Sequence, residues 1–369
     1  MARANMRDLS FATFNLRNLQ VPGGVTYGPG PDLADDAAGR AAYDRRIAWI
    51  AAQIRRLDAR IIGFQELWAR QALVDAFDRA GLTDAYDLIA RDAPGRGRPQ
   101  VALAVRKDRR GRSLVDAGAG WIAAFPPSFR LDGLRETDGA EEEITVTVDA
   151  FSRPLLRATI RAEGVRPTPP PVTVLVAHLK SKGPARLSFA RPRAEVLDRH
   201  PSLARSAASH IRRVMEAGAL RVLLDEITAP ADDDALSPTV VLGDLNDDTL
   251  SVTNEMISAQ PTYRVAAKGR AGSRTNRGLY SVERLQQFRS MRHVYYTYIY
   301  KHKRESLDHI LVSEEFYDHS LRRQWSFREM EVYNDHLNRP ELEETEGASD
   351  HGLVRAAFDW NPMPRDAEA

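Results

Sequence analysis

Short apolar runs with the pattern of β-strands alternate with amphipathic helical stretches along this chain of 369 residues. One helical stretch, residues 43–57, places Ile47, Ile50, Ile54 and Leu57 at helical spacing. The strand-like runs are residues 9–15, 61–64, 101–105, 113–115, 144–148, 155–160, 172–178, 240–242, 307–312 and 352–358, and the helical stretches are residues 43–57, 71–80 and 201–217. Because these runs continue from residue 9 to residue 358 without a repeat or a linker, we predict a single α/β domain over residues 1–369.

The composition excludes several other classes of protein. Hydrophobic residues make up 43% and charged residues 28%, which excludes a disordered or collagen-like chain. The absence of cysteine excludes disulfides, thiolate zinc sites and a cysteine nucleophile. We see no apolar run near the roughly 20 residues that span a bilayer and no apolar secretory segment, so we expect a cytoplasmic protein. A net charge of +1 excludes a generally basic nucleic-acid coat, but it leaves a local basic face open.

Polar side chains stand where several of the strand-like runs end or begin. Such positions lie at the rim of a sheet, where functional sites are usually built. The chain also lacks a GxSxG nucleophile motif, so carboxylates, amides and imidazoles at these positions indicate a hydrolase that uses a hard metal ion. The residues at these positions are Asn15, Glu66, His178, Asp244, Asn246, Asp308, Asp350 and His351.

Six segments around these residues resemble, in order, the motifs of the endonuclease/exonuclease/phosphatase superfamily. They read TFNLRNL, IIGFQELW, VAHLKSKG, VVLGDLNDD, SLDHILVS and SDHGLV. HLKSKG, followed by YTYIYKHKRESLDHILVS, is most similar to the bacterial nuclease-like branch. The resemblance implies a four-layer α-β-β-α sandwich in which two mostly antiparallel sheets pack face to face with helices outside.

The same resemblance implies a divalent cation, Mg²⁺ or Mn²⁺, bound near the first two motifs. Glu66 would be a direct ligand, and the alternative is an ion pair with a neighbouring arginine. Asn15 would turn its amide oxygen to the metal or to Glu66, although an asparagine at a strand end is commonly a turn former. Asp350 would reach the metal from the last motif.

Asp244 and Asn246 are two residues apart, so in an extended segment their side chains point to the same side. A carboxylate and an amide can then face one phosphate. The resemblance implies that Asp244 orients or deprotonates the attacking water and that Asn246 donates hydrogen bonds to phosphate oxygens. We interpret the following Asp247 and Asp248 as loop or cap residues.

Asp350 and His351 are adjacent, and adjacent extended residues point in opposite directions. A partner for His351 is therefore expected elsewhere, and Asp308 is the available carboxylate. The family pattern agrees, with Asp308 holding the imidazole in its tautomer and favouring its protonated form. His309 should face away and serve a structural role.

His178 would contact the scissile phosphate, with a structural histidine at a strand end as the alternative. An asparagine often precedes this histidine in the related branch, whereas Ala177 stands here, so a supporting hydrogen bond is missing. Lys180 and Lys182 follow at alternate positions and could face the same phosphate as electrostatic helpers. Two arginines resemble family arginines near the site, namely Arg153 and Arg205.

The segment 264–304 concentrates positive charge in a chain of almost zero net charge. Its cationic residues are Arg264, Lys268, Arg270, Arg274, Arg277, Arg284, Arg289, Arg292, Lys301, Lys303 and Arg304, and five tyrosines are interleaved. Neutralisation of phosphates together with aromatic stacking is how nucleic acid is held. We therefore predict that this basic, tyrosine-rich insertion is a nucleic-acid surface, with Arg270, Arg274 and Arg277 among its contacts. The alternative is an ordinary solvated insertion.

The motifs together predict a metal-dependent phosphodiester hydrolase that uses direct water attack, because no covalent nucleophile stands out. A nuclease is the leading hypothesis. A small-molecule or lipid phosphoesterase of the same superfamily is the alternative, and a non-catalytic phosphate-binding module is a second alternative. The sequence indicates no protein partner.

Overall fold

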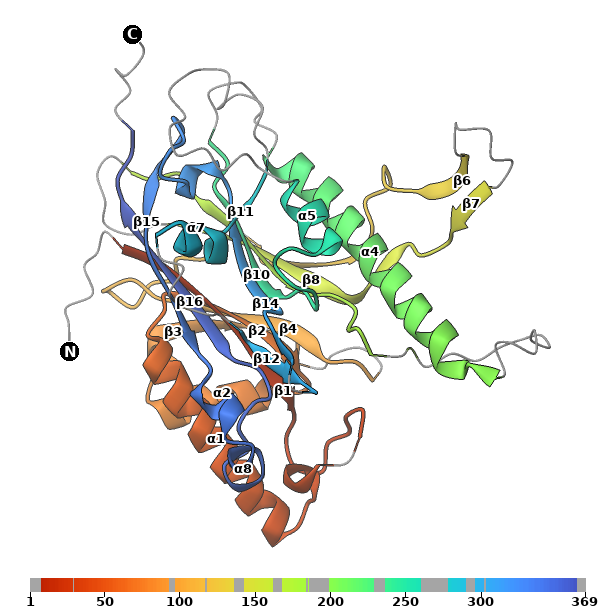
Figure 1. Cartoon of the computed structure of the whole chain (residues 1–369). Helices are drawn as coiled ribbons and strands as arrows, with labels where there is room; N and C mark the ends of the chain where they lie inside the picture. Colours follow the sequence, from red (N-terminus) through yellow and green to blue (C-terminus); the bar gives the residue numbers. More distant parts are fainter. Residues whose placement is uncertain are drawn as a thin grey trace.

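The computed structural model describes residues 8–28, 30–92, 97–116, 118–135, 143–161, 168–183, 185, 199–228, 236–259, 278–289, 296–301 and 303–363. Two six-stranded sheets pack against each other at the centre of the molecule (Figure 1). Helices cover their outer faces. None of the helices in these ranges has both the length and the apolar character that a bilayer crossing requires.

The first sheet has the strand order β15-β16-β1-β2-β4-β3. Only the central pair β1–β2 is parallel, and the other neighbouring strands are antiparallel. The strands are β1 (Asp8–Leu19), β2 (Ile61–Leu67), β3 (Tyr86–Ile89), β4 (Gln100–Arg106), β15 (Trp325–Tyr333) and β16 (Leu353–Trp360).

The second sheet has the order β11-β14-β10-β9-β8-β5, and it repeats this arrangement around a parallel central pair, β10–β9. Its other pairs are antiparallel. The strands are β5 (Gly120–Ala124), β8 (Ala150–Ile160), β9 (Val172–His178), β10 (Thr239–Asp244), β11 (Tyr280–Ser281) and β14 (Asp308–Val312). The expectation of two mostly antiparallel sheets is confirmed.

Apolar side chains from the facing surfaces of both sheets form the central core. Phe11 and Leu103 of the first sheet pack with Val174 and Leu242 of the second, all fully buried. The sheets approach closely at Gly63, where a Cβ atom would lie 3.1 Å from the Leu242 Cβ. Burial on both faces explains why these strands read as continuous apolar runs rather than as alternating ones.

Each sheet packs its other face against helices, which completes the four predicted layers. Ile50 of α1 (Ala37–Leu57) and Phe77 of α2 (Arg70–Ala80) join the outer core of the first sheet. Leu220 of α4 (Pro201–Thr228) and Ile257 of α5 (Val252–Ser258) join that of the second. The other helices in the described ranges are α7 (Val282–Arg289) and α8 (Glu341–Thr345), with short 3-10 turns at Pro31–Leu33, Thr83–Ala85, Glu314–Phe316 and Asp335–Asn338.

In the part of the chain that the structure describes, two hairpins lie outside the main sheets. The hairpin β6 (Leu131–Arg135) and β7 (Glu143–Val146) projects from the body beside α4 (Figure 1). The hairpin β12 (Tyr298–Tyr300) and β13 (Lys303–Glu305) directly precedes β14. Its two strands belong to the predicted basic insertion.

The largest differences from the predicted elements occur at the sheet edges. The expected strand at residues 113–115 is wrong, because only Val115 forms an isolated bridge, to Ile160. The edge strands β3, β5 and β15 were absent from the sequence prediction. Each carries half-buried or exposed positions, so none presents the continuous apolar signal of a central strand. The helix expected at residues 201–217 continues to Thr228.

Candidate active site

The predicted polar residues gather at one end of the seam between the two sheets. In the second sheet, Asp244 on β10 pairs with His178 on β9 and with Asp308 on β14. These three residues therefore lie side by side across three neighbouring strands. In the first sheet, β1 delivers Asn15 and β2 delivers Glu66. The ends of both central parallel pairs therefore meet here.

Glycine before Asp244 is required by the close packing of β10 on β9. A Cβ atom at Gly243 would lie 1.9 Å from the backbone oxygen of Ala177 on the neighbouring strand. Any side chain would push β10 away from β9 and displace Asp244 from His178. This contact explains the glycine in the GDLN segment.

Unusual backbone conformations hold Glu66 in place. Arg17, Asn18 and Glu66 all have positive φ, at 50°, 55° and 60°. The β1–β2 register shifts between Asn15 and Leu19, and this irregularity lets the Asn18 backbone N–H donate to Glu66 Oε2 at 2.9 Å. Non-glycine residues adopt this region rarely and at a cost, so three together indicate a local structure built around the Glu66 carboxylate.

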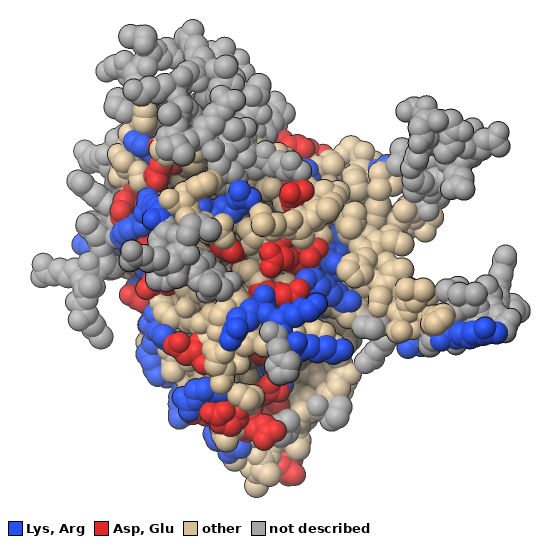
Figure 2. Space-filling model, in the orientation of Figure 1, with Lys and Arg blue, Asp and Glu red and all other residues tan. Residues whose placement is uncertain are grey.

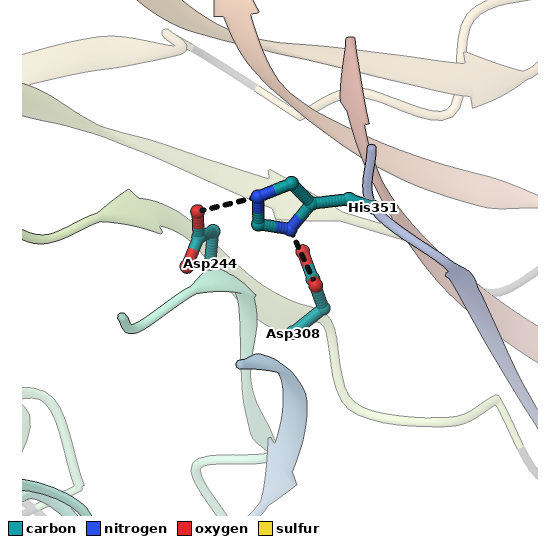
Figure 3. A group of neighbouring side chains, drawn as sticks. All are labelled: Asp244, Asp308 and His351. Carbon is teal, nitrogen blue, oxygen red and sulfur yellow. Dashed lines mark hydrogen bonds and ion pairs between the residues drawn. The ribbon is translucent and has the colours of Figure 1, made fainter. Parts of the chain in front are cut away.

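A histidine lies between two buried carboxylates (Figure 3). His351 Nδ1 lies 2.8 Å from Asp308 Oδ2, and His351 Nε2 lies 3.8 Å from Asp244 Oδ2. The expected contact between Asp308 and His351 is therefore present. Burial alone would lower the pKa of His351, but the Asp308 and Asp244 carboxylates raise it well above its ordinary value, so the ring favours the charged form.

Asp244 is the most connected carboxylate of the site. Its Oδ2 accepts a hydrogen bond from Asn15 Nδ2 at 3.0 Å and lies 3.5 Å from His178 Nε2. Burial is the main cause that raises the pKa of Asp244 to about 7. The nearby charges of Asp308 and Glu66 also raise this pKa, whereas His351 lowers it. A carboxyl group that titrates near neutrality can accept a proton at physiological pH.

Asn15 makes hydrogen bonds with both ends of its amide. Its side-chain oxygen accepts a hydrogen bond from the Arg17 backbone N–H at 2.9 Å, and its expected role toward a metal stays a prediction. The amide nitrogen then faces Asp244, and this fixes the orientation of the group, because an N–H must meet an oxygen. The Asn15 carbonyl accepts from Ser349 Oγ at 2.8 Å, which ties β1 to the segment before His351.

Glu66 and Asp350 form a second acidic group beside this one. Burial raises the pKa of Glu66, Arg153 opposes the rise, and the neighbouring Asp350 charge adds to it. Asp350 lies 3.8 Å from the guanidinium of Arg17 and keeps much of its surface exposed. Two oxygen ligands with incomplete charge compensation fit a hard divalent cation.

Asp244, Asp308 and His351 also have the donor types and spacing that could hold a metal ion, with ligand atoms within 4.8 Å of one another. However, the imidazole turns different nitrogens toward the two carboxylates (Figure 3). One ring cannot direct both nitrogens at one ion, so this arrangement favours hydrogen bonding within the group.

Asn246 is not in the extended conformation that the sequence suggested. Its φ is 56°, and its backbone N–H donates back to Asp244 Oδ1 at 2.9 Å, which forms a turn. The side-chain nitrogen donates to the Leu179 carbonyl at 3.1 Å. An amide nitrogen carries two hydrogens, so one donor remains for a substrate oxygen. The strand ends at Asp244, which is why the alternation rule fails here.

His178 is fully buried and held as the neutral imidazole. Burial, Arg153, His351 and Lys180 all lower its pKa well below the ordinary value. Its Nδ1 has no hydrogen-bond partner among the described residues, as the alanine at position 177 suggested. Arg153, expected near the site, is buried and donates to the Leu179 carbonyl at 3.0 Å.

Lys180 and Lys182 direct their ammonium groups to different partners. Lys182 Nζ lies 2.8 Å from Glu305 Oε1 on β13 and 3.5 Å from Asp247 Oδ1. Lys180 Nζ donates to Ser181, and burial lowers the Lys180 pKa. Strand geometry ends at His178, so these two positions do not share a face by alternation.

Arg205 does not anchor helix α4 near the site, because its side chain is exposed. Arg213, two turns further along the helix, has that place. It is buried, donates to the Lys180 carbonyl at 3.3 Å and pairs with Asp247 at 3.4 Å. Glu216 accepts from the Lys180 and Ser152 backbone N–H groups at 2.8 and 2.7 Å.

The sequence reasoning missed these two helix residues. Arg213 and Glu216 lie three residues apart, and the apolar Ala217 and Leu220 follow at the next helical spacings. Charged residues at helical spacing beside apolar residues that face the core could have predicted that Arg213 and Glu216 are buried.

Other expected residues have structural contacts or lie outside the described ranges. His309 Nε2 lies 2.8 Å from the Asp247 carbonyl, in keeping with a structural role. Arg270, Arg274 and Arg277 lie outside the described residues.

The family model for the endonuclease/exonuclease/phosphatase family matches residues 12–351. The chain therefore belongs to this family, whose members are hydrolytic phosphoesterases that typically depend on a divalent metal. The predicted family and sandwich fold are both confirmed.

Solved structures with the same fold differ widely in their named activities. The human Nocturnin catalytic domain with bound sulfate has a TM-score of 0.52, 14% identity, and coverage of 96% of this chain and 95% of that one. An endonuclease/exonuclease/phosphatase from Bacteroides vulgatus has a TM-score of 0.51, 15% identity and coverage of 96% and 99%. The Bacteroides thetaiotaomicron mannosyl-6-phosphatase has a TM-score of 0.50, 15% identity and coverage of 95% and 100%. No curated protein sequence matches this chain.

Proposed function

We propose that this protein is a divalent-metal-dependent phosphodiester hydrolase, and specifically a nuclease, that uses direct attack by water. The observation that carries the proposal is Asp244, a buried carboxyl group with a pKa raised to about 7 at the row of His178, Asp308 and His351. At neutral pH, part of this group is ionised and able to take a proton from water.

The other residues divide the remaining work of phosphoester cleavage. His351, held in its charged form by Asp308, would donate to a phosphoryl oxygen as negative charge develops there. The spare Asn246 N–H and the neutral His178 would meet the other oxygens. Arg153 lies behind them as a fixed positive charge, since it influences both Glu66 and His178.

Glu66 and Asp350 would hold Mg²⁺ or Mn²⁺, with Asn15 near them as an indirect contributor through Arg17. The bound ion would screen the phosphate charge. Both carboxylates are hard oxygen donors, and Asp350 has solvent access for a hydrated ion that keeps several waters.

The hairpin β12–β13 supports nucleic acid as the substrate. It carries an exposed tyrosine and three exposed cationic side chains, namely Tyr300, Lys301, Lys303 and Arg304. Figure 2 shows basic and acidic side chains gathered on the part of this face where β12 lies in Figure 1. Aromatic and cationic groups beside a phosphoesterase site suit a polyanion with stacked bases.

A substrate panel tests the proposal. Purified protein is assayed on plasmid, linear DNA, RNA, sphingomyelin and bis-p-nitrophenyl phosphate, each with and without chelator. We expect metal-dependent cleavage of a nucleic acid at a higher kcat/KM than of the lipid, and at least about 100-fold slower cleavage by the matched Asp244→Asn variant. Preference for a small or lipid phosphoester would favour the alternative enzyme, and no hydrolysis of any substrate would favour a binding module.

A further inference from the structure

The Asp308–His351 contact joins the two sheets. Asp308 begins β14 of the second sheet, and His351 stands just before β16 of the first. A side-chain distance of 2.8 Å across this seam requires the two strand ends to keep a fixed relative position. Apolar packing between the sheets stabilises their association but is not directional. Hydrogen bonds, which have a preferred geometry, are needed to set the relative position of the two strand ends.

Thr297, at the base of the β12–β13 hairpin, makes directional contacts to both strand ends. Its side-chain oxygen accepts hydrogen bonds from the backbone N–H groups of Leu307 at 2.9 Å and Asp308 at 3.1 Å. Its backbone carbonyl accepts from the Gly352 N–H at 2.7 Å. One fully buried residue thus holds the backbone beside both members of the contact.

The next residue adds a contact to the imidazole itself. Tyr298 forms a single β-bridge with His351, and the two rings lie 5.0 Å apart between centroids at an interplanar angle of 37°. The Tyr298 ring therefore lies against the imidazole of His351 on the side of the β12–β13 hairpin and limits its rotation. The ion pair between Glu305 of the hairpin and Lys182 ties the same hairpin to the segment after β9.

We propose that Thr297 is a positioning residue for the Asp308–His351 contact. Its hydrogen bonds hold the start of β14 and the segment before β16 in a fixed relative position, and Tyr298 restrains the imidazole of His351. This role rests on the proposed function for its effect on turnover, but the contact it controls can be observed without any substrate. Thr297 itself touches neither the ring nor the carboxylate, so its effect passes through the backbone.

Three variants and one control test the proposal. Thr297→Val keeps the shape and removes the acceptor, Thr297→Ser keeps the acceptor, and Thr297→Ala leaves room for water should the valine variant fail to fold. The control is Thr239→Val, an equally buried threonine at the opposite end of β10 from Asp244, whose hydroxyl donates to the Ser237 carbonyl.

We expect Thr297→Val to lower kcat for bis-p-nitrophenyl phosphate by about 10- to 100-fold with KM changed less than about 3-fold, the scale for a misplaced catalytic group. Thr297→Ser should stay within about 3-fold of the parent kcat, and Thr239→Val should match the parent. If Thr297→Val does not fold, Thr297→Ala is expected to show the same split between kcat and KM.

Proton NMR reads the contact directly through the low-field imidazole proton between His351 Nδ1 and Asp308. The signal, assigned by its loss in His351→Ala, should persist in Thr297→Ser and broaden or shift in Thr297→Val. An unchanged signal in Thr297→Val, with or without a loss of turnover, would overturn the proposal. A changed signal in a protein that hydrolyses none of the substrates would uphold the positioning role and reject the proposed function.

Discussion

The two sheets bring carboxylates to the same site in contrasting surroundings. The first sheet supplies Glu66 and the segment of Asp350, whose side chains are 18% and 42% exposed. The second supplies Asp244 and Asp308, which are 2% and 0% exposed. Solvent reaches one half of the site and is excluded from the other.

This difference matches two kinds of chemistry. A hard cation exchanges with water and keeps several water ligands, so its carboxylates need access to solvent. Proton transfer at neutral pH needs a carboxyl group with a raised pKa. Burial raises the pKa of both Glu66 and Asp244, and Asp244, whose pKa reaches about 7, is the one of the two that lies in the half without solvent. We infer that the first sheet holds the ion and the second, together with His351, handles the proton.

Removal of the metal should have the largest effect. Exhaustive chelation should abolish turnover, and Mg²⁺ or Mn²⁺ should restore it, because the Glu66 and Asp350 oxygens suit a hard cation. Turnover is measured before chelation, after it and after metal is returned, with thermal unfolding as the control for folding. Full activity after chelation would contradict the proposal that Glu66 and Asp350, in the solvent-accessible half of the site, bind a catalytic ion.

Glu66→Gln sharpens the same assignment. Loss of one carboxylate should raise the metal concentration needed for half-maximal turnover by about 10-fold or more. A metal titration of the variant against the parent checks this. An identical titration would remove Glu66 from the set of ligands.

Changes in the buried half should resist rescue by metal. Asp244→Asn and His351→Ala should each lower kcat by at least about 100-fold, the scale for a positioned acid–base group, at any metal concentration. The measurement is kcat under saturating Mg²⁺, with circular dichroism to establish folding. Near-parent turnover in either variant would contradict the role proposed for that residue.

The pH profile should report Asp244. Because its pKa is about 7 and the ionised form accepts the proton, kcat/KM should rise about tenfold per pH unit below 7 and level off above it. His351 has a pKa raised well above 6.5, so it stays charged through this range and should not cause a fall there. A profile that is flat from pH 5 to 8 would exclude Asp244 as the titrating base.

The smallest effect is expected from the basic insertion. Neutralising Arg270, Arg274 and Arg277 together should weaken oligonucleotide binding and reduce the slope of log affinity against log salt by roughly three. Hydrolysis of bis-p-nitrophenyl phosphate should stay nearly unchanged, since neither half of the site is altered. If the parent and the variant had the same oligonucleotide affinity at every salt concentration, the basic insertion would not be a nucleic-acid surface. The protein would then be described only as a phosphoesterase.

The sequence predicted the central elements better than the edges, for a physical reason. The strands that carry Asp244 and His178 are buried on both faces, so their sequences are almost continuously apolar. The edge strand β5 alternates exposed and half-buried positions and gives no such signal. Position at the end of a buried strand predicted which residues would lie together, such as Asp244 beside His178 and Asp308, whereas most of their hydrogen-bond partners could not be predicted in this way.

The order of the motifs and the polar residues at strand ends already determined the family, the sandwich and the residues that meet at its rim. Alternation of side chains also disfavoured a direct Asp350–His351 pair, and the family pattern indicated Asp308 as the partner of His351. Only the tertiary structure decided the contacts that depend on the irregular backbone beyond the strands, such as the Asn15 oxygen on Arg17 and the turn at Asn246. It also decided that Thr297 joins the two sheets, because that contact arises from the packing of strands far apart in sequence and follows no local periodicity.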